Sequence, residues 1–226
     1  MPVSAGLITG RAEATNAVQQ HLAETWVWEG KPAAQWATDL TSVRSKEAQL
    51  RGLEADLNQA RTSTDAASAE LHERNVQALA MLRAKYRRDP DTVGLLKGPD
   101  AVGDGRREIL SDCADLETVW GRLPENAATL TPTLSRSSFA AARAAGQAKV
   151  EALEGLLAAG RKARKEYHDT LAELWEDCVD FYAAACARFP EDTPEGRMIR
   201  GIPTTPSAPS PAPSEPAAAP AAGQPT

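Results

Sequence analysis

The chain matches itself without a gap when it is shifted by 103 residues. The matched stretches are residues 50–53 with 153–156, 69–71 with 172–174, and 95–98 with 198–201. Self-similarity at a fixed offset is typical of a repeated structural unit, and each copy here spans about 65–70 residues. The sequence therefore predicts two copies of one helical unit, each of which buries its apolar side chains against the other.

The composition is that of a helical protein. Only 5% of the 226 residues are aromatic, and Ala, Leu, Glu and Arg, all strong helix formers, are abundant. The net charge of −6 argues against a general nucleic-acid-binding protein. No stretch approaches 18 uninterrupted apolar residues, so we expect no membrane-spanning helix.

The cysteines and the N-terminus indicate a compartment. Cys113, Cys178 and Cys186 are odd in number and are not spaced as metal ligands, which is typical of reduced thiols in a cytoplasm. Residues 1–10 lack the basic flank and apolar stretch of a secretion signal. We therefore expect a cytoplasmic protein.

Residues 1–32 are predicted to form a lead segment that contains one helix. Its helix is expected at residues 11–28, because apolar side chains recur there at spacings of three and four. These positions are Ala14, Ala17, Val18, Leu22, Thr25 and Trp26. The sequence Gly30-Lys31-Pro32 ends the segment.

Residues 33–98 are predicted to form a first helical hairpin. Its helices are expected at 33–60 and 66–88, separated by Thr62-Ser63-Thr64-Asp65, a run of residue types that cap helices. No Pro or Gly marks this turn, and the apolar pattern nearly continues through it. One uninterrupted helix of about 55 residues is therefore the alternative.

The second half of the chain repeats this plan. Residues 99–135 form a second lead segment and loop, with a helix at 105–123 that resembles the N-terminal helix at an offset of about 95. Residues 136–202 form the second hairpin, with helices at 137–160 and 170–188. Residues 203–226, rich in Pro and Ala, are predicted to be a disordered tail, because they cannot bury enough apolar surface to offset the ordering entropy.

Each copy is predicted to close with a short helix. Pro90 and Pro194 stand where a first helical residue is expected, each next to an acid that favours a helix N-terminus. Gly98 and Gly201 follow at positions that suit a helix C-terminus. Each short helix should fold back over its hairpin.

The predicted fold is all-α. Two tandem hairpins pack as an antiparallel four-helix bundle with short flanking helices. Gly52 and Gly155 occupy equivalent places inside long helices, where Gly is unfavourable. We expect both to mark a close approach of backbones near the pseudo-two-fold axis. The five tryptophans are expected to anchor the core.

No candidate catalytic, cofactor-binding or metal-binding residue emerges from the sequence. A di-iron bundle needs Glu-x-x-His on two helices, and none of His21, His72 and His168 has Glu three residues before it. Cys178 lies on an apolar stripe, as a small hydrophobic residue does. No phosphate-binding loop, Gly-x-Ser-x-Gly or dinucleotide motif is present. We therefore predict no cofactor.

One stretch resembles a known group of proteins. It runs from Phe181-Tyr182 through Phe189-Pro190 and Thr193-Pro-Glu-Gly196 to Pro203-Thr-Thr205. This stretch resembles the ending of uncharacterised bacterial all-helical proteins, in which an aromatic-Pro pair leads to a Thr-Pro-Glu-Gly turn and a Pro-Thr-Thr exit. The resemblance implies a bacterial, all-helical protein and brings no activity with it.

Two hypotheses for function follow from these observations. The first is a non-enzymatic interaction or assembly protein whose partner is a protein, either the same chain or another. The second is a small-molecule- or metal-binding helical protein, possibly an enzyme, with a site between the two hairpins. A buried cluster of Glu, His or Tyr at the axis would favour the second hypothesis, and an apolar axis would favour the first.

Overall fold

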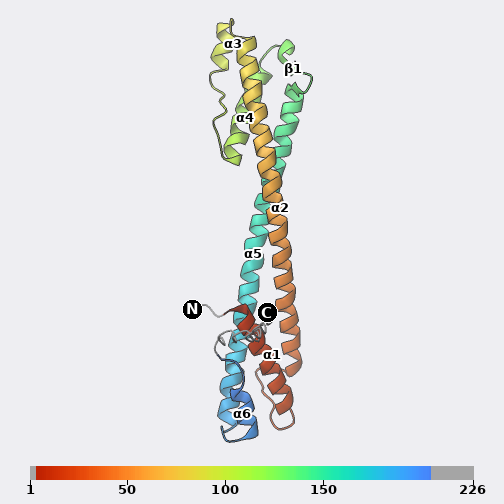
Figure 1. The fold of residues 1–226 in the computed structure, drawn as a ribbon, viewed down its shortest axis with the longest axis vertical. Helices are drawn as coiled ribbons and strands as arrows, with labels where there is room; N and C mark the ends of the chain where they lie inside the picture. Colours follow the sequence, from red (N-terminus) through yellow and green to blue (C-terminus); the bar gives the residue numbers. More distant parts are fainter. Residues whose placement is uncertain (1–3, 205–226) are drawn as a thin grey trace, which may run out of the picture. The chain divides into compact units, whose positions relative to one another are not determined.

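The computed structural model describes residues 4–204, and most of these are helical (Figure 1). The elements in chain order are α1 (Ala5–Leu22), α2 (Ala33–Lys85), α3 (Pro90–Leu95), α4 (Arg106–Gly121), the short 3₁₀ helix η1 (Glu125–Ala127), β1 (Thr129–Thr131), β2 (Leu134–Ser135), α5 (Arg136–Arg188) and α6 (Pro194–Arg200). The predicted all-α class is confirmed, with one small antiparallel β1–β2 pair added to it. The predicted tail, 203–226, lies outside the described residues except for its first two.

Each predicted hairpin is instead one continuous helix. α2 and α5 are both 53 residues long, so the turns expected at 62–65 and near 160–169 are wrong. Thr64 Oγ1 donates a hydrogen bond to the Ala60 carbonyl at 2.7 Å, and Thr62 Oγ1 donates to the Asn58 carbonyl at 3.0 Å. These hydroxyls bond back into the helix instead of capping a new one. The alternative of one long helix is confirmed, and the four-helix bundle is not.

The described chain divides into two compact units. Unit 1 combines Met1–Ser45 with Tyr167–Thr226, and unit 2 is Lys46–Glu166. Unit 1 therefore holds the start of α2 and the end of α5, together with α1 and α6. Unit 2 holds the rest of both long helices with α3, α4 and the strands. Both long helices thus belong to both units.

The core of unit 1 packs α1 and α6 against the start of α2 and the end of α5. Trp36 and Phe181 are fully buried at its centre. Trp26 and Trp28 pack on Phe181 with ring centroids 5.9 and 5.3 Å apart. The tryptophans predicted as core anchors do anchor this unit.

The core of unit 2 packs α4 against the end of α2 and the start of α5. Trp120 and Phe139 are fully buried, with ring centroids 5.7 Å apart. The Trp120 indole N–H donates to the Ala127 carbonyl at 2.8 Å. Buried leucines and an isoleucine of α2 and α4 belong to the same core: Leu71, Leu79, Leu82, Ile109, Leu110 and Leu116.

The lead helices differ from the prediction in position. α1 begins at Ala5, because the Ser4 side chain caps it by accepting from the Leu7 amide. The buried residues of α4 lie 98 positions after buried residues of α1, instead of about 95. The pairs are Arg11 with Ile109, Ala12 with Leu110, Thr15 with Cys113, Val18 with Leu116, and Leu22 with Trp120.

The two predicted short helices are present. α3 is capped by Asp89 and α6 by Thr193, and each has Pro near its first position. Gly201 is the C-terminal cap of α6, as predicted, but Leu96 and not Gly98 caps α3. Gly196 must be Gly, because a Cβ there would overlap the Pro190 carbonyl oxygen.

Gly52 and Gly155 do not mark a close approach. A Cβ added at either position would meet nothing within 4 Å, so that prediction is wrong. The close approaches lie at two other glycines of α5. A Cβ on Gly146 would sit 3.4 Å from Leu71 Cδ2, and one on Gly160 would sit 3.3 Å from Leu57 Cδ1. Small residues thus let α2 side chains approach α5 within unit 2.

Candidate functional site

The most unusual chemistry of the described chain is a row of buried polar side chains on α1. Arg11, Thr15 and Gln19 follow one another at intervals of four residues, so they share one face of the helix. All three are buried in the core of unit 1. We call them the polar stripe of α1. A lead helix does not need such a stripe to pack, because Ile109 and Cys113 stand at the matching positions of α4.

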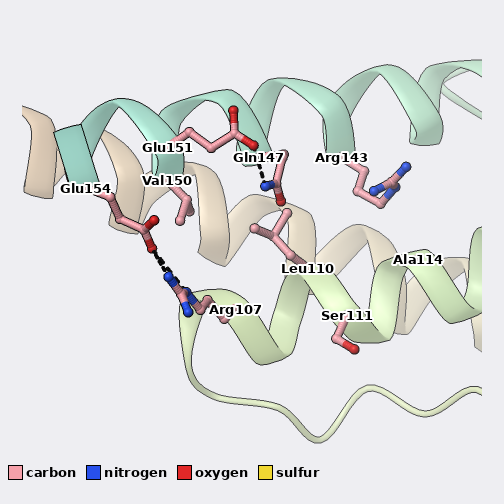
Figure 2. A pocket seen from close by; sticks show the side chains of 9 residues that line it. All are labelled: Arg107, Leu110, Ser111, Ala114, Arg143, Gln147, Val150, Glu151 and Glu154. Carbon is pink, nitrogen blue, oxygen red and sulfur yellow. Dashed lines mark hydrogen bonds and ion pairs between the residues drawn. The ribbon is translucent and has the colours of Figure 1, made fainter.

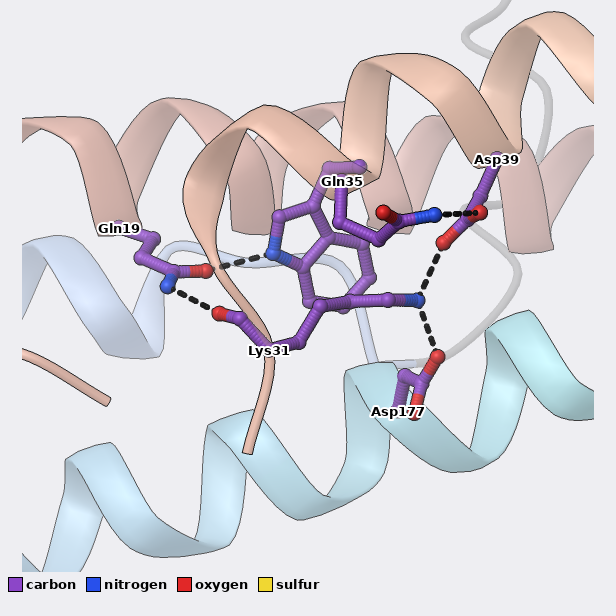
Figure 3. A network of polar contacts seen from close by, with 6 residues as sticks. Gln19, Lys31, Gln35, Asp39 and Asp177 are labelled. Atoms are coloured by element: carbon purple, nitrogen blue, oxygen red, sulfur yellow. Dashed lines mark hydrogen bonds and ion pairs between the residues drawn. The ribbon is translucent and has the colours of Figure 1, made fainter. Parts of the chain in front are cut away.

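Gln19 joins the stripe to the start of α2. Its side-chain N–H donates to the Lys31 carbonyl at 2.6 Å, and its oxygen accepts from the Trp36 indole N–H at 2.5 Å (Figure 3). Trp36 has no exposed surface, so its N–H needs a partner inside the protein. The amide of Gln19 therefore fixes the loop before α2 and the central tryptophan together.

Lys31 continues this network with a largely buried ion pair. Its side chain is 11% exposed, and its ammonium contacts the carboxylates of Asp39 and Asp177, as Figure 3 shows. Burial alone lowers the pKa of Lys31, but the hydrogen bonds and charges of Asp177 and Asp39 outweigh burial and raise it. Lys31 Nζ also lies 4.5 Å from the centroid of the Trp36 ring. Lys31 thus remains a cation, which suits a structural role and not that of a base.

Thr15 faces a cysteine in the middle of the stripe. Burial raises the pKa of the Cys178 thiol to about 11, although the Thr15 hydroxyl beside it and the charges of Arg11 and Lys31 act in the opposite direction. At neutral pH this thiol is protonated and therefore a poor nucleophile. The Thr15 oxygen is fully buried and makes no full hydrogen bond.

Arg11 ends the stripe and contacts aromatic rings. Its guanidinium carbon lies 4.5 Å from the centroid of the Trp175 ring and 5.5 Å from that of Tyr182. Its Nε is fully buried without a hydrogen-bond partner. The arginine is therefore held by its flat faces, while the N–H groups at its edge lack protein acceptors among residues 4–204.

Unit 2 has an open cleft of about 350 Å³ between α4 and the start of α5 (Figure 2). Its charged groups are paired: Arg107 Nε lies 3.0 Å from Glu154, Arg143 contacts Glu117, and Gln147 donates to Glu151 at 2.7 Å. Opposite charges that pair in this way leave little net charge among the lining residues for a ligand to use. The cleft is therefore a polar groove between α4 and α5.

A larger cavity in unit 2 lies between α2, the loop before α4, and α4. Its volume is about 690 Å³. His72, Val102 and Ile109 line it, and so do four charged side chains: Asp65, Glu73, Asp104 and Arg106. Arg106 and Asp65 pair with each other at 2.7 Å. Its lining still exposes more apolar surface than that of the cleft.

The three histidines and three cysteines do not come together. His21 is exposed, His72 lines the larger cavity, and His168 packs against Tyr167 with ring centroids 5.7 Å apart. Burial raises the pKa of Cys113 to about 12, so this thiol also stays protonated at neutral pH. Within residues 4–204, no three His, Cys, Asp or Glu side chains are grouped so that they could hold a metal ion.

The sequence analysis missed the polar stripe because it followed apolar residues. Of the predicted inner positions, Val18 and Leu22 are buried, but Ala17 is exposed and Ala14 is half-buried. The recurrence of Arg11, Thr15 and Gln19 at intervals of four was a usable signal. The matching positions of α4 are buried as well, and this comparison shows that the face points inward.

Searches against protein-family models, curated proteins and solved structures found no match to the chain. In the part of the chain that the structure describes, no helix combines the length and the apolar character needed to span a membrane.

Proposed function

We propose that the chain is a duplicated, non-enzymatic interaction protein of the bacterial cytoplasm. Each of its two units binds a partner protein through the outer face of a long helix. The proposal has three supports: the equal lengths of the long helices, an exposed face whose residues recur in both, and the charge of that face.

The helix lengths support duplication. α2 and α5 have the same length, and their first residues, Ala33 and Arg136, are separated by the sequence offset of 103. A short helix with an N-terminal proline follows each of them. Each long helix also follows a lead helix whose buried positions correspond. One ancestral unit of lead helix, long helix and short helix accounts for all of these features.

The observation that carries the proposal is an outer face that is identical in the two long helices. We call it the matched face. It consists of Ala69, Glu73, Val76, Ala80 and Ala84 in α2, and of Ala172, Glu176, Val179, Ala183 and Ala187 in α5. All ten residues are exposed. Packing explains why buried positions stay alike in two copies, but it does not act on exposed ones.

The valines of the matched face are the most informative members. Val76 is 44% exposed and Val179 is 40% exposed, so each leaves apolar surface in water. Valine is also a weaker helix former than alanine or glutamate. A valine kept at both sites therefore suggests a contact with another molecule. The alanines beside it leave room for a helix to approach closely.

The charge of the matched face points to a basic partner. Glu73 and Glu176 are exposed, and neither has a basic partner among the described residues. Asp180 and Glu173 add negative charge beside Val179. The chain as a whole carries a net charge of −6, so two copies would repel each other at these faces. The partner that fits is a different protein with a basic amphipathic helix.

Site-specific photo-crosslinking in the native host tests the proposal. A photoreactive amino acid is placed at Val76 in one strain and at Val179 in another, with the exposed α2 position Gln59 as the matched control. We expect one and the same partner protein to be captured at positions 76 and 179 and not at 59. Glu73→Arg and Glu176→Arg should each abolish capture at the neighbouring position.

Three outcomes would contradict the proposal. Equal capture at Gln59 would show that the matched face is not selective. Different proteins at positions 76 and 179 would remove the argument from duplication. A crosslinked dimer of this chain would show that the partner is a second copy, against the charge argument.

The larger cavity of unit 2 favours a second candidate function, the binding of a small apolar molecule. Its volume of about 690 Å³ falls within the range of small-molecule sites. Ala101→Trp should fill it from the loop before α4 and leaves the matched face unchanged. Native mass spectrometry of protein purified from the host would show a bound molecule on the wild-type chain and none on the variant; a wild-type chain with no added mass would exclude this candidate.

A further inference from the structure

Arg11 is a buried cation without a charged partner. Its side chain is 4% exposed, and no acid pairs with it among residues 4–204. A guanidinium stays protonated at any accessible pH, so it cannot escape this position by losing its proton. Contact with the Trp175 face stabilises the charge. That contact leaves the N–H groups at the edge of the guanidinium without acceptors.

The charge is not needed for packing. The matching residue of the other lead helix is Ile109, which is buried and uncharged. Trp175, on which Arg11 stacks, corresponds at the offset of 103 to His72 of α2. An apolar pair of similar size would therefore complete the core of unit 1, and Arg11 needs another explanation.

A second polar atom beside Arg11 also lacks a partner. The hydroxyl of Thr15, one turn along α1, is fully buried, and its polar neighbour is the Cys178 thiol, a weak hydrogen-bonding group that does not satisfy it. In unit 1, the unsatisfied buried side-chain atoms of the described residues are these two, Arg11 Nε and Thr15 Oγ1. Buried polar atoms without partners are rare, and two of them on one helix face suggest a missing acceptor.

Two other cations lie near Arg11, and both are paired with acids. Arg200 and Arg11 both lower the pKa of the Tyr182 phenol, which burial and the neighbouring Cys186 raise. Lys31 and Arg11 both lower the pKa of the Cys178 thiol. Arg200 pairs with Glu191, and Lys31 pairs with two carboxylates, so among these three cations Arg11 is the one that can take a further anion.

We propose that Arg11, stacked on Trp175 and Tyr182, binds a small oxyanion, a carboxylate or a phosphate. The planar guanidinium presents parallel N–H donors that match two oxygens of such a group, and the Thr15 hydroxyl adds a donor one turn away. The site uses the inner side of α1 and α5 and no residue of the matched face. It therefore stands or falls independently of the partner-binding proposal.

NMR of the full chain, in which the side-chain Nε–H of arginine is observed directly, tests the site. Inorganic phosphate and acetate are each titrated at constant ionic strength. We expect the Arg11 Nε–H signal to shift and saturate with at least one of them, and the stronger of the two identifies the ligand class. Arg44, an exposed arginine of the same unit that pairs with Glu13, serves as the control and should not shift.

Thermal unfolding supplies a second measurement. The binding anion should raise the melting temperature of the wild-type chain and of Arg44→Met. In Arg11→Met, the anion concentration needed for the same rise should increase roughly 10- to 100-fold, because the charge-assisted hydrogen bonds are lost. Arg11→Lys keeps the charge without the paired donors, so the anion concentration that it needs should lie between those of the wild-type chain and Arg11→Met.

The proposal is overturned if neither anion gives a saturable shift of the Arg11 signal. It is also overturned if Arg11→Met responds to the anions as the wild-type chain does. Either result would show that Arg11 is held by its aromatic neighbours alone.

Discussion

Units 1 and 2 share a plan but differ in what their lead helices place in the core. α1 buries Arg11 and Thr15, whereas α4 buries Ile109 and Cys113 at the matching positions. The central tryptophans differ in the same way. Trp36 donates to the side chain of Gln19, and Trp120 donates to the backbone carbonyl of Ala127. A side chain of the lead helix thus fixes the central tryptophan of unit 1, and a backbone carbonyl fixes that of unit 2.

The difference shows which buried positions of the lead helices must be small or apolar and which can also hold a polar side chain. Both lead helices need small or apolar residues at Ala12 and Leu110, where they meet the long helices. Beyond that, the frame accepts either an apolar or a polar side chain, provided that the polar group finds a partner. Gln19 has such partners, and Arg11 does not. The polar groups that the frame does not satisfy are thus where ligand chemistry is to be sought.

The largest expected effect is the loss of either central tryptophan. Trp36→Ala and Trp120→Ala should each lower the free energy of unfolding by about 3–5 kcal/mol, because both side chains are fully buried. Urea unfolding followed by circular dichroism measures this loss. A loss below about 1 kcal/mol at either position would show that one unit contributes little to global stability.

Milder changes at the same positions sharpen the comparison. Trp120→Phe leaves the buried Ala127 carbonyl without a hydrogen-bond donor. Because a backbone carbonyl cannot rotate away, we expect the free energy of unfolding to fall by about 1–3 kcal/mol for the lost hydrogen bond, in addition to the loss from the smaller ring. Trp36→Phe frees the Gln19 amide, which can rotate. The Trp120 variant should therefore lose more stability than the Trp36 variant, and equal losses would contradict the distinction between the units.

Alkaline pH should destabilise both units through their buried thiols. The pKa of Cys113 is raised from 9.0 to about 12, and that of Cys178 from 9.0 to about 11. In the unfolded chain both thiols ionise near pH 9, so stability is intact below pH 9 and falls as pH rises toward those values. Unfolding free energies should therefore decline above pH 9. Cys113→Ala and Cys178→Ala should each flatten that decline when compared with their own values at pH 7.

Ion pairs should matter more in unit 1 than in unit 2. Lys31→Met leaves Asp39 and Asp177 without their cation inside a partly buried network, and we expect a loss of about 1–3 kcal/mol. Arg107→Met breaks an exposed pair with Glu154 and should change stability by less than about 1 kcal/mol. The comparison is made by urea unfolding at low and high salt. A larger loss of unfolding free energy for Arg107→Met than for Lys31→Met would contradict our interpretation that the Lys31 network is the more stabilising of the two.

The smallest effects concern three glycines of the long helices. Gly52→Ala and Gly155→Ala should each stabilise the protein by about 0.5–1 kcal/mol, because the added methyl meets open space. Gly160→Ala is the matched control on α5. Its methyl would press on Leu57 Cδ1 at 3.3 Å, so it should give no gain. Thermal unfolding that shows the opposite order would place Gly155 inside a contact.

Much of the frame could be predicted from the sequence. The offset of 103 places the starts of α2 and α5 correctly relative to each other, and the prolines at 90 and 194 locate the short helices. The continuation of each long helix through 62–65 and 160–169 could not be predicted reliably. The hydroxyls of Thr62 and Thr64 satisfy a helix cap and a mid-helix carbonyl equally well, and only packing decides between the two.

The candidate site was harder to predict than the frame. An apolar pattern identifies the inner face only when that face is apolar, and the polar stripe of α1 breaks this condition. The glycines misled for a related reason. Gly52 and Gly155 recur in both copies, and recurrence was interpreted as contact although both sites are open. Recurrence alone therefore does not place a residue in a contact inside the molecule, which only distances show.

The division of the chain into units has a consequence for its synthesis. Unit 2 is one uninterrupted stretch, Lys46–Glu166, whereas unit 1 joins Met1–Ser45 to residues that begin at Tyr167. A ribosome makes the chain from its N-terminus, so the lead helix α1 emerges first but must wait for the end of α5. Unit 2 therefore completes while Arg11 and Trp26 are still without the aromatic partners that the end of α5 supplies. The unit with the richer chemistry is the last to close, and a chaperone that protects the nascent chain would meet the apolar side of α1 during that interval.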